Sequence, residues 1–309
     1  MATEASALAR PGPGSALSPE AILAPTPGAL LRKRIFGHGG FMIGTIVLVL
    51  VMLTALLAPV LAPHDPYAQD LTRRLIPPIW YEKGVWAHPL GTDQLGRDYL
   101  SRMIYGSRIS LLIGLSVMCI SGLIGTTLGI VAGYFGGRVD LAIGYLITTR
   151  LSLPVILVAL AIVALVGSSL WIVILVLGLL KWDRFAVVMR SATMQTRNLD
   201  YVTAARAMGC SNMRIVLGEI VPNITGNIVV VATLEMASAI LLEASLSFLG
   251  LGVQPPLPSW GLMIAEAKQY MFFSAWLINI PGLALLALVL AINLLGDGIR
   301  DIAAPEQRT

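Results

Sequence analysis

Three ionisable residues stand in stretches of the chain that are otherwise apolar. Glu235 lies near the middle of a stretch over 224–249, Glu243 follows about two helical turns later on broadly the same side, and Arg150 lies inside 141–166. An isolated carboxylate inside a membrane costs about 2.5 kcal/mol or more, so Glu235 is expected to face a cavity, a partner subunit or a proton. All three are candidates for lining a substrate path. A hydrogen bond between subunits or a buried neutral acid stays open for Glu235, as does snorkelling toward the cytoplasm for Arg150.

A long segment of polar and small residues, over 200–222, separates two strongly apolar stretches. Asp200 is predicted to cap a helix over 201–208, Gly209 to turn left-handed after it, and Ser211 to cap a second helix. Two large side chains and two methyl groups recur on one helix face, where another protein's backbone can approach closely. The residues of this face are Tyr201, Ala204, Ala205 and Met208. The spacing is equally typical of a loop helix that packs on its own bundle.

This segment resembles the EAA loop of ABC importer permeases, in which Glu-Ala-Ala is followed after three residues by Gly and later by Leu-Pro. The matching residues are Ala204, Ala205, Gly209 and Pro222. Thr203 stands where the family pattern has Glu, and Val221 where it has Leu. The resemblance implies that 200–217 is a cytoplasmic coupling helix seated in a groove of an ATPase subunit. The implied coupling residues are Tyr201, Thr203, Ala204, Ala205, Met208 and Gly209.

Three further segments are similar to the dipeptide and oligopeptide branch of these permeases. They are HPLGTDQLGRDYLSRMIYGSRISL over 88–111, LLEASLSFLGLGVQPPLPSWG over 241–261 and NLLGDGIRD over 293–301. The resemblance covers about 35 to 305, and it implies that the loop with the first segment faces the periplasm, where a substrate-binding protein docks. Asp93 is predicted to cap a helix over 97–105, which taken alone also fits a helix lying along the membrane surface.

The composition is that of an integral membrane protein. Of the 309 residues, 56% are hydrophobic and 12% are charged, and the mean hydropathy is +0.81, whereas a soluble domain has about 25% charged residues. The net charge of +4 is better explained by inside-facing loops than by nucleic acid. Cys119 lies in an apolar stretch and Cys210 in the 200–222 segment, so they predict neither a disulfide nor a metal site.

Apolar stretches long enough to cross a hydrocarbon core of about 30 Å indicate six transmembrane helices. They lie near 41–61, 109–134, 141–166, 170–190, 224–249 and 275–295. Cations over 32–34, and a modest excess in alternate loops, place both termini in the cytoplasm. The expected divisions are a disordered cytoplasmic tail over 1–34, a first transmembrane helix over 35–61, a periplasmic loop over 62–108, a five-helix permease core over 109–302 and a cytoplasmic C-terminal tail over 303–309.

Smaller features predict how these helices pack and bend. Glycines at four-residue intervals leave one face of the second stretch bare, so a neighbouring helix can pack closely against it. These glycines are Gly125, Gly129 and Gly133. Pro154 is predicted to kink the third stretch because it removes a backbone hydrogen bond. Lys181 and Arg184, at the end of the fourth stretch, are predicted to anchor it at the inner membrane interface.

These features predict an all-α integral membrane protein with six transmembrane helices. The resemblance adds the fold of a type I ABC importer permease with a cytoplasmic coupling helix. It implies the transmembrane permease subunit of a bacterial ATP-driven importer in the inner membrane, for di- or oligopeptides. Nickel chelates, opines and glutathione stay open as substrates, because permeases similar to one another handle each of them.

The chain itself is not expected to be an enzyme or to hold a cofactor. None of its lysines follows a glycine, so a G-x-x-x-x-G-K phosphate loop is absent from the sequence. ATP and Mg²⁺ are expected on two ATP-binding partner subunits, beside a homologous permease subunit that completes a heterodimer and a periplasmic substrate-binding protein. An ion-coupled secondary transporter, with Glu235 and Arg150 as coupling residues, and a membrane scaffold without transport are the alternatives.

Overall fold

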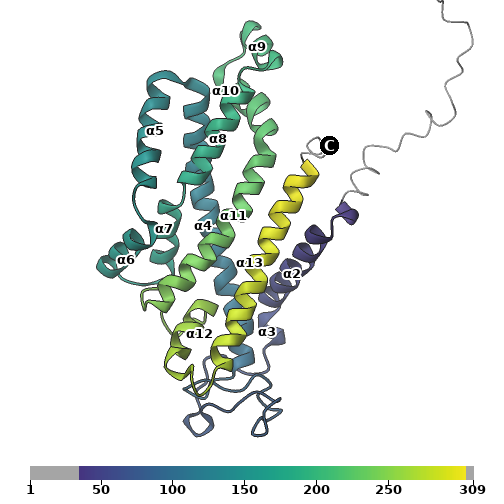
Figure 1. Cartoon of the computed structure of the whole chain (residues 1–309), viewed down its shortest axis with the longest axis vertical. Helices are drawn as coiled ribbons and strands as arrows, with labels where there is room; N and C mark the ends of the chain where they lie inside the picture. The colour runs from purple at the N-terminus through teal and green to yellow at the C-terminus, as the bar shows by residue number, and fades with distance from the viewer. Residues whose placement is uncertain (1–34, 304–309) are drawn as a thin grey trace, which may run out of the picture. The chain divides into compact units, whose positions relative to one another are not determined.

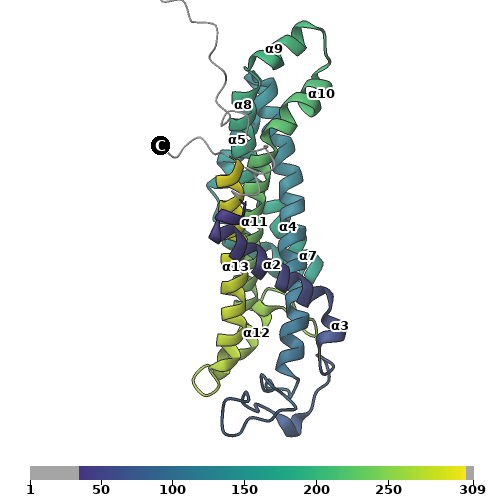
Figure 2. The ribbon, with the colours of Figure 1, turned by 90° about the vertical axis from the view of Figure 1, so that its right-hand side faces the viewer.

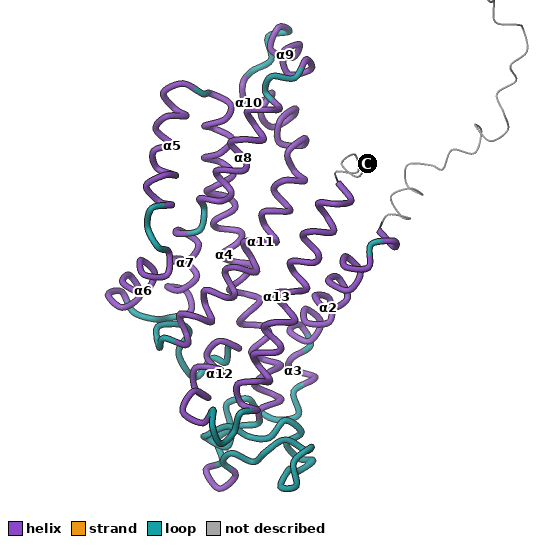
Figure 3. The backbone as a smooth tube through the Cα atoms, viewed as in Figure 1, coloured by secondary structure: helices purple, strands orange, loops and turns teal. Residues whose placement is uncertain are grey.

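The computed structural model describes residues 35–303, so the predicted tail over 1–34 and residues 304–309 lie outside it. The described residues up to Gly37 belong to a separate unit, and the helices below belong to the unit that begins at His38. Figure 3 shows them as helices joined by loops, which confirms the all-α class. In chain order they are α2 (Gly39–Leu56), α3 (Ala58–Leu61), the 3₁₀ turn η2 (Leu71–Arg73), α4 (Tyr99–Phe135), α5 (Gly137–Leu151), α6 (Val155–Val166), α7 (Leu170–Leu180), α8 (Asp183–Thr196), α9 (Asp200–Ala207), α10 (Asn212–Ile215), the π-helical turn η3 (Val216–Ile220), α11 (Val221–Phe248), α12 (Trp260–Ala267), the 3₁₀ turn η4 (Lys268–Tyr270) and α13 (Trp276–Ala303).

The longest helix, α4, runs along the bundle in Figure 2 and packs against α2, α7, α8 and α11. Asp98, not the predicted Asp93, caps its N-terminus by accepting a hydrogen bond from the backbone N–H of Ser101 at 2.8 Å. The predicted helix over 97–105 and the predicted span over 109–134 therefore form one helix of 37 residues. The interpretation as a separate helix along the membrane surface is wrong, because nothing interrupts α4 between them.

Four helical segments are long and apolar enough to cross a membrane, and a fifth span results if α5 and α6 count as one bent span. Six spans were predicted, so length and composition support four to five of them in the described residues. The continuous ones are Gly39–Leu56, Tyr99–Phe135, Asn212–Phe248 and Trp276–Ile302. They correspond to the stretches predicted near 41–61, 109–134, 224–249 and 275–295.

The other two predicted stretches, 141–166 and 170–190, are each broken. Pro154 separates α5 from α6, and the two helices meet at 81°. Proline has no N–H to donate and disfavours helical backbone in the residue before it, so the predicted kink is confirmed. Lys181 and Trp182 separate α7 from α8. The side chain of Lys181 is buried there, so the second break coincides with a charge inside the bundle.

Aromatic side chains join the first turns of α4 to α12 and α13. Tyr99 lies edge to face with Trp276, with ring centroids 5.3 Å apart, and its hydroxyl donates to the carbonyl of Leu277 at 2.5 Å. The indole N–H of Trp260 donates to the carbonyl of Met103 at 2.9 Å. In Figure 1, α12 and the first turns of α4 and α13 lie at the end of the bundle that carries the long loop before α4. The contacts hold that end together.

The glycine face of α4 packs directly on α8, as predicted. A Cβ atom added at Gly125, Gly129 or Gly133 would lie 2.2, 2.6 or 2.7 Å from a backbone carbonyl oxygen within 182–190. Real Cβ atoms do not approach so closely, so the two helices would have to separate. The bare face therefore sets the distance between α4 and α8.

We predict that Gly129→Ala lowers the stability of the chain, whereas Gly144→Ala does not. The new methyl group at Gly129 would meet the carbonyl of Ala186 at 2.6 Å, and such overpacking costs about 1–3 kcal/mol. Gly144, in α5, has nothing within 4 Å of an added Cβ and serves as the matched control, with a gain of up to about 1 kcal/mol. Thermal unfolding of the purified variants in detergent measures both, and equal midpoints would contradict the role of the glycine face.

Candidate functional site

The segment after α8 has the predicted arrangement of helix, hinge and helix. α9 begins at Asp200, although Leu199 rather than Asp200 is its N-cap. Gly209 follows with a φ of +79°, the left-handed conformation that glycine adopts without strain. Ser211 caps α10 by accepting a hydrogen bond from the backbone N–H of Arg214 at 3.4 Å. Figures 1 and 2 show α9 and α10 at the end of the bundle opposite α12.

The last turn of α4 holds this segment. The hydroxyl of Tyr134 donates to Oδ1 of Asn212 in α10 at 2.9 Å, and the guanidinium of Arg206 in α9 lies 5.8 Å from the centre of the Tyr134 ring. Val202 and Ala205 are buried in the same apolar cluster as Tyr134. Hydrogen bonding, a cation–π contact and burial therefore attach both short helices to α4.

The exposed face of α9 differs from the predicted one at a single position. Tyr201, Ala204 and Met208 are exposed, with Met208 at 77%. Ala205 is only 6% exposed and packs on the chain itself, so its place on the docking face was wrong. Val202 lies on the same buried side of α9, and this side covers the end of the bundle. Thr203 is exposed but its hydroxyl donates to the backbone of its own helix at 3.3 Å.

Glu235 is fully buried in α11 and has partners in its own chain. Its Oε2 lies 2.8 Å from Nζ of Lys181, and its Oε1 lies 3.4 Å from Nη1 of Arg184. Nζ of Lys181 also donates to the hydroxyl of Ser238 at 2.8 Å. The cations of Lys181 and Arg184, at the α7–α8 break, thus pair with the Glu235 carboxylate. These ion pairs compensate the cost of burying a carboxylate inside the bundle. Glu235 faces no open path in this conformation, while the Arg184 side chain is 63% exposed.

The predicted transmembrane stretches did not indicate that Lys181 pairs with Glu235. The predicted fourth span placed Lys181 at the inner membrane interface, but the observed break places it before α8, whose 14 residues extend about 21 Å toward the α9 end. Lys181 is 6% exposed and is not an interfacial anchor. The sequence signal for the pair was one cation and one acid inside neighbouring predicted spans.

Glu243 is also buried in α11, two turns beyond Glu235. Its Oε1 accepts hydrogen bonds from the hydroxyls of Ser247 at 2.7 Å and Ser259 at 3.0 Å. Ser259 is the N-cap of α12, so Glu243 ties the end of α11 to the start of that helix. The carboxyl group therefore sits in an internal hydrogen-bonded contact, away from the partners of Glu235.

Arg150 lies at the break between α5 and α6. Its Nε donates to the carbonyl of Leu180 at 2.6 Å, and its Nη1 donates to the carbonyl of Leu153 at 3.2 Å. These are carbonyls at the C-terminal end of α7 and in the break itself, where helical partners are missing. Arg150 thus joins the broken segment to α7. The three predicted path residues have separate partners and do not form one site.

The loop before α4 contains a second buried charge cluster. Oδ2 of Asp93 lies 2.6 Å from Nε of Arg97 and 2.5 Å from Nη1 of Arg102. Both arginines also reach Glu266 of α12, at 3.2 and 2.8 Å. The motif G-T-D-x-x-G-R-D-x-x-S-R contains three of the four residues of this cluster. The fourth, Glu266, lies in α12. The motif therefore fixes the loop to α12 rather than leaving it open.

Comparison with protein families identifies the class. Residues 125–309 match the family described as the inner membrane component of binding-protein-dependent transport systems, and residues 26–78 match the N-terminal transmembrane domain of oligopeptide transport permease C. The chain therefore belongs to the family of binding-protein-dependent transport system inner membrane components. It is a multi-pass inner membrane protein and a transporter subunit rather than an enzyme.

Relatives of known name cover most of the chain. The dipeptide transport system permease protein DppC of Haemophilus influenzae is 42% identical over 267 residues, which are 86% of this chain and 90% of that protein. The di/tripeptide transport system permease protein DppC of Pseudomonas aeruginosa is 44% identical over 272 residues, 88% of this chain and 90% of that protein. The expected resemblance to ABC importer permeases of the dipeptide branch is confirmed.

A solved structure supports the fold. An inward-facing structure of the MetNI methionine ABC transporter has a chain that matches with a TM-score of 0.55, covering 65% of this chain and 96% of its own length. Sequence identity is 20%, so this likeness concerns the fold alone. It agrees with the predicted architecture of a type I importer permease.

We predict that Glu235→Leu destabilises the chain more than the double variant that also carries Lys181→Met. The single change leaves the Lys181 ammonium buried without its counter-charge, a loss of about 3–5 kcal/mol, whereas the double change removes both charges. Asp183→Asn, at a partly exposed acid two residues from Lys181, is the control and should cost less than about 1 kcal/mol. Unfolding in mixed micelles is measured for the unchanged chain, for Glu235→Leu and Lys181→Met alone, and for the double variant. If the two single effects on the free energy of unfolding add up to the effect of the double variant, the two side chains are not coupled.

Proposed function

We propose that the chain is the permease subunit of a peptide ABC importer, which takes up di- or oligopeptides. The support is the identity of 42% and 44% to relatives named as dipeptide and di/tripeptide permeases, over nearly their whole length. A third relative, of Escherichia coli, is named as a probable D,D-dipeptide permease and is 37% identical over 279 residues. Small peptides are thus the substrate class shared by these names.

In this proposal α9 and α10 dock on an ATP-binding subunit, and two such subunits serve a pair of homologous permeases. The observation that carries it is the exposed apolar surface of Tyr201, Ala204 and Met208, in and just after α9, a short helix whose Arg206 contacts the Tyr134 ring. Because Thr203 replaces the family Glu and bonds its own backbone, the contact depends on shape and burial rather than on an ion pair. This chain needs no cofactor, and Mg²⁺ and ATP belong to the partner.

The orientation follows from the same assignment. With α9 in the cytoplasm, the opposite end of the bundle, with α12 and the loop over 62–98, faces the periplasm and receives a substrate-binding protein. Both termini are then cytoplasmic. Movement of the ATP-binding subunits would reach α4 through Tyr134, and α4, about 55 Å long at 1.5 Å per residue, would carry it toward the periplasmic end.

Disulfide crosslinking tests the proposal. In a chain whose Cys119 and Cys210 are replaced by serine, we expect Met208→Cys to crosslink under mild oxidation to a cysteine in the copurified ATP-binding subunit. Ala205→Cys is the matched control on the buried side of the same helix, and it should crosslink at least about tenfold less. A crosslink also places α9 on the cytoplasmic side.

The contradicting results are equally concrete. If no ATP-binding subunit copurifies with the chain, the proposed importer is wrong. If one copurifies but Met208→Cys and Ala205→Cys react to the same extent, the subunit does not dock on the exposed face of α9.

A further inference from the structure

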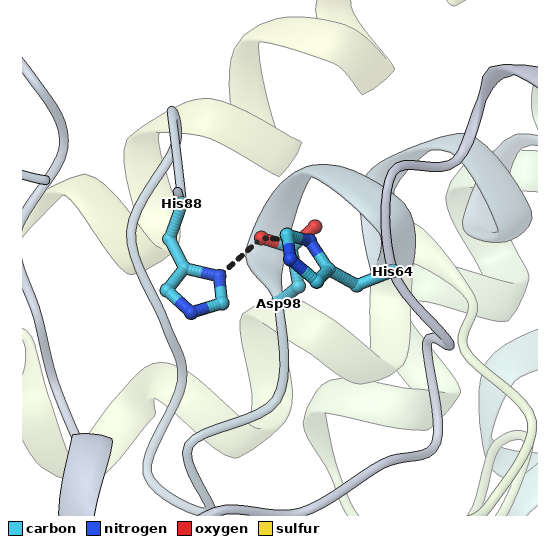
Figure 4. A group of neighbouring side chains, drawn as sticks. All are labelled: His64, His88 and Asp98. Carbon is cyan, nitrogen blue, oxygen red and sulfur yellow. Dashed lines mark hydrogen bonds and ion pairs between the residues drawn. The ribbon is translucent and has the colours of Figure 1, made fainter. Parts of the chain in front are cut away.

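Two histidines and a carboxylate converge just before α4, in the loop over 62–98 (Figure 4). Nδ1 of His88 lies 2.8 Å from Oδ1 of Asp98, and Nδ1 of His64 lies 3.7 Å from the same oxygen. One ligand atom from each of the three residues lies within 4.8 Å of the other two. They come from three places in the chain: the segment after α3, the middle of the loop and the N-cap of α4.

Ser101 orients the carboxylate toward the histidines. Oδ2 of Asp98 accepts hydrogen bonds from the backbone N–H of Ser101 at 2.8 Å and from its hydroxyl at 2.7 Å. That oxygen is therefore occupied, and Oδ1 is the one that faces the two imidazoles. The Ser101 hydroxyl oxygen also accepts from the backbone N–H of His64 at 3.0 Å, which positions that histidine. Such outer contacts are what orient ligands at metal sites.

The cluster is buried on one side and open on the other. His88 and Asp98 are 7% and 2% exposed, while the side chain of His64 is 42% exposed. The open side gives an ion a way in and leaves room for water as a fourth ligand. The buried side keeps two ligands fixed, which lowers the cost of ordering them on binding.

The geometry points to a binding site for a divalent transition-metal ion of the zinc class, with His64, His88 and Asp98 as its three protein ligands. Bonds of about 2.0–2.2 Å in a tetrahedron place ligand atoms about 3.3 Å apart, which lies between the observed 2.8 and 3.7 Å. Imidazole nitrogen with one carboxylate oxygen suits zinc better than calcium or magnesium, which prefer oxygen ligands. To bind the ion through Nδ1, the His88 ring must be neutral and carry its proton on Nε2.

A bound ion would connect the loop to the helix. His64 begins the loop and Asp98 ends it, so one ion closes a stretch of chain that otherwise has few regular elements. The site lies at the end of the bundle opposite α9, and it is independent of the coupling segment. Metal binding by this loop is a property beyond the proposed transport function, and it does not depend on which substrate is transported.

The test uses the full-length chain in lipid nanodiscs, purified through an affinity tag without histidine and treated first with a chelator. Zn²⁺ is added alone, and the metal retained after dialysis is measured by mass spectrometry, with affinity from calorimetry. We expect one Zn²⁺ per chain. His64→Ala, His88→Ala and Asp98→Asn should each weaken the affinity at least about tenfold. Asparagine caps helices as well as aspartate does, so Asp98→Asn separates metal binding from the capping of α4.

His38→Ala is the matched control, because His38 is the remaining histidine of the chain and lies in the N-cap of α2, away from the cluster. Its affinity for Zn²⁺ should stay within about twofold of the unchanged chain, since it contributes no ligand. His64 is exposed, so His64→Ala decides the matter even if a buried variant fails to fold. No Zn²⁺ on the unchanged chain, or equal retention by His64→Ala, would overturn the assignment.

Discussion

The close contact between the glycine face of α4 and the backbone of α8 is the constraint on which the other features depend. Any side chain at Gly125, Gly129 or Gly133 would separate the two helices, because their backbones already lie at the limit of approach. That contact aligns the C-terminal end of α4 with the end of α8, where the α9 segment begins. It also brings Trp182, and hence the neighbouring Lys181, close to α4 at the break before α8. Helix packing therefore positions both the α9–α10 segment and the buried charge.

Buried charges are compensated inside the chain at two levels of the bundle. Lys181 and Arg184 meet Glu235 between α7, α8 and α11, and the cluster around Asp93 joins the long loop to α12. Removing one partner of such a pair costs far more than its presence contributes, because an unpaired charge is left in a poorly solvated place. These clusters thus fix which helices pair, rather than adding much stability. Transport cycles that separate α7 from α11 would have to break one of them.

What the sequence could predict was local. The glycine face, the break at Pro154 and the hinge at Gly209 each follow from one residue type and its backbone chemistry, and the structure has all three. The depth of Lys181 and the inward side of Ala205 depend on neighbouring helices that no spacing specifies. A buried alanine and an exposed alanine look alike in a sequence. Family resemblance supplied the class, which the matches to named permeases confirm.

Tyr134, in the last turn of α4, is the residue whose side chain contacts both α9 and α10. The most direct measurement is the ratio of peptide taken up to ATP hydrolysed, in proteoliposomes that contain the complete importer. Tyr134→Ala should lower this ratio several-fold while the complex stays assembled, and Leu141→Ala, at a 77% exposed position of α5, should leave it unchanged. An unchanged ratio in an assembled Tyr134→Ala complex would contradict the proposal that α9 and α10 act on the bundle through α4.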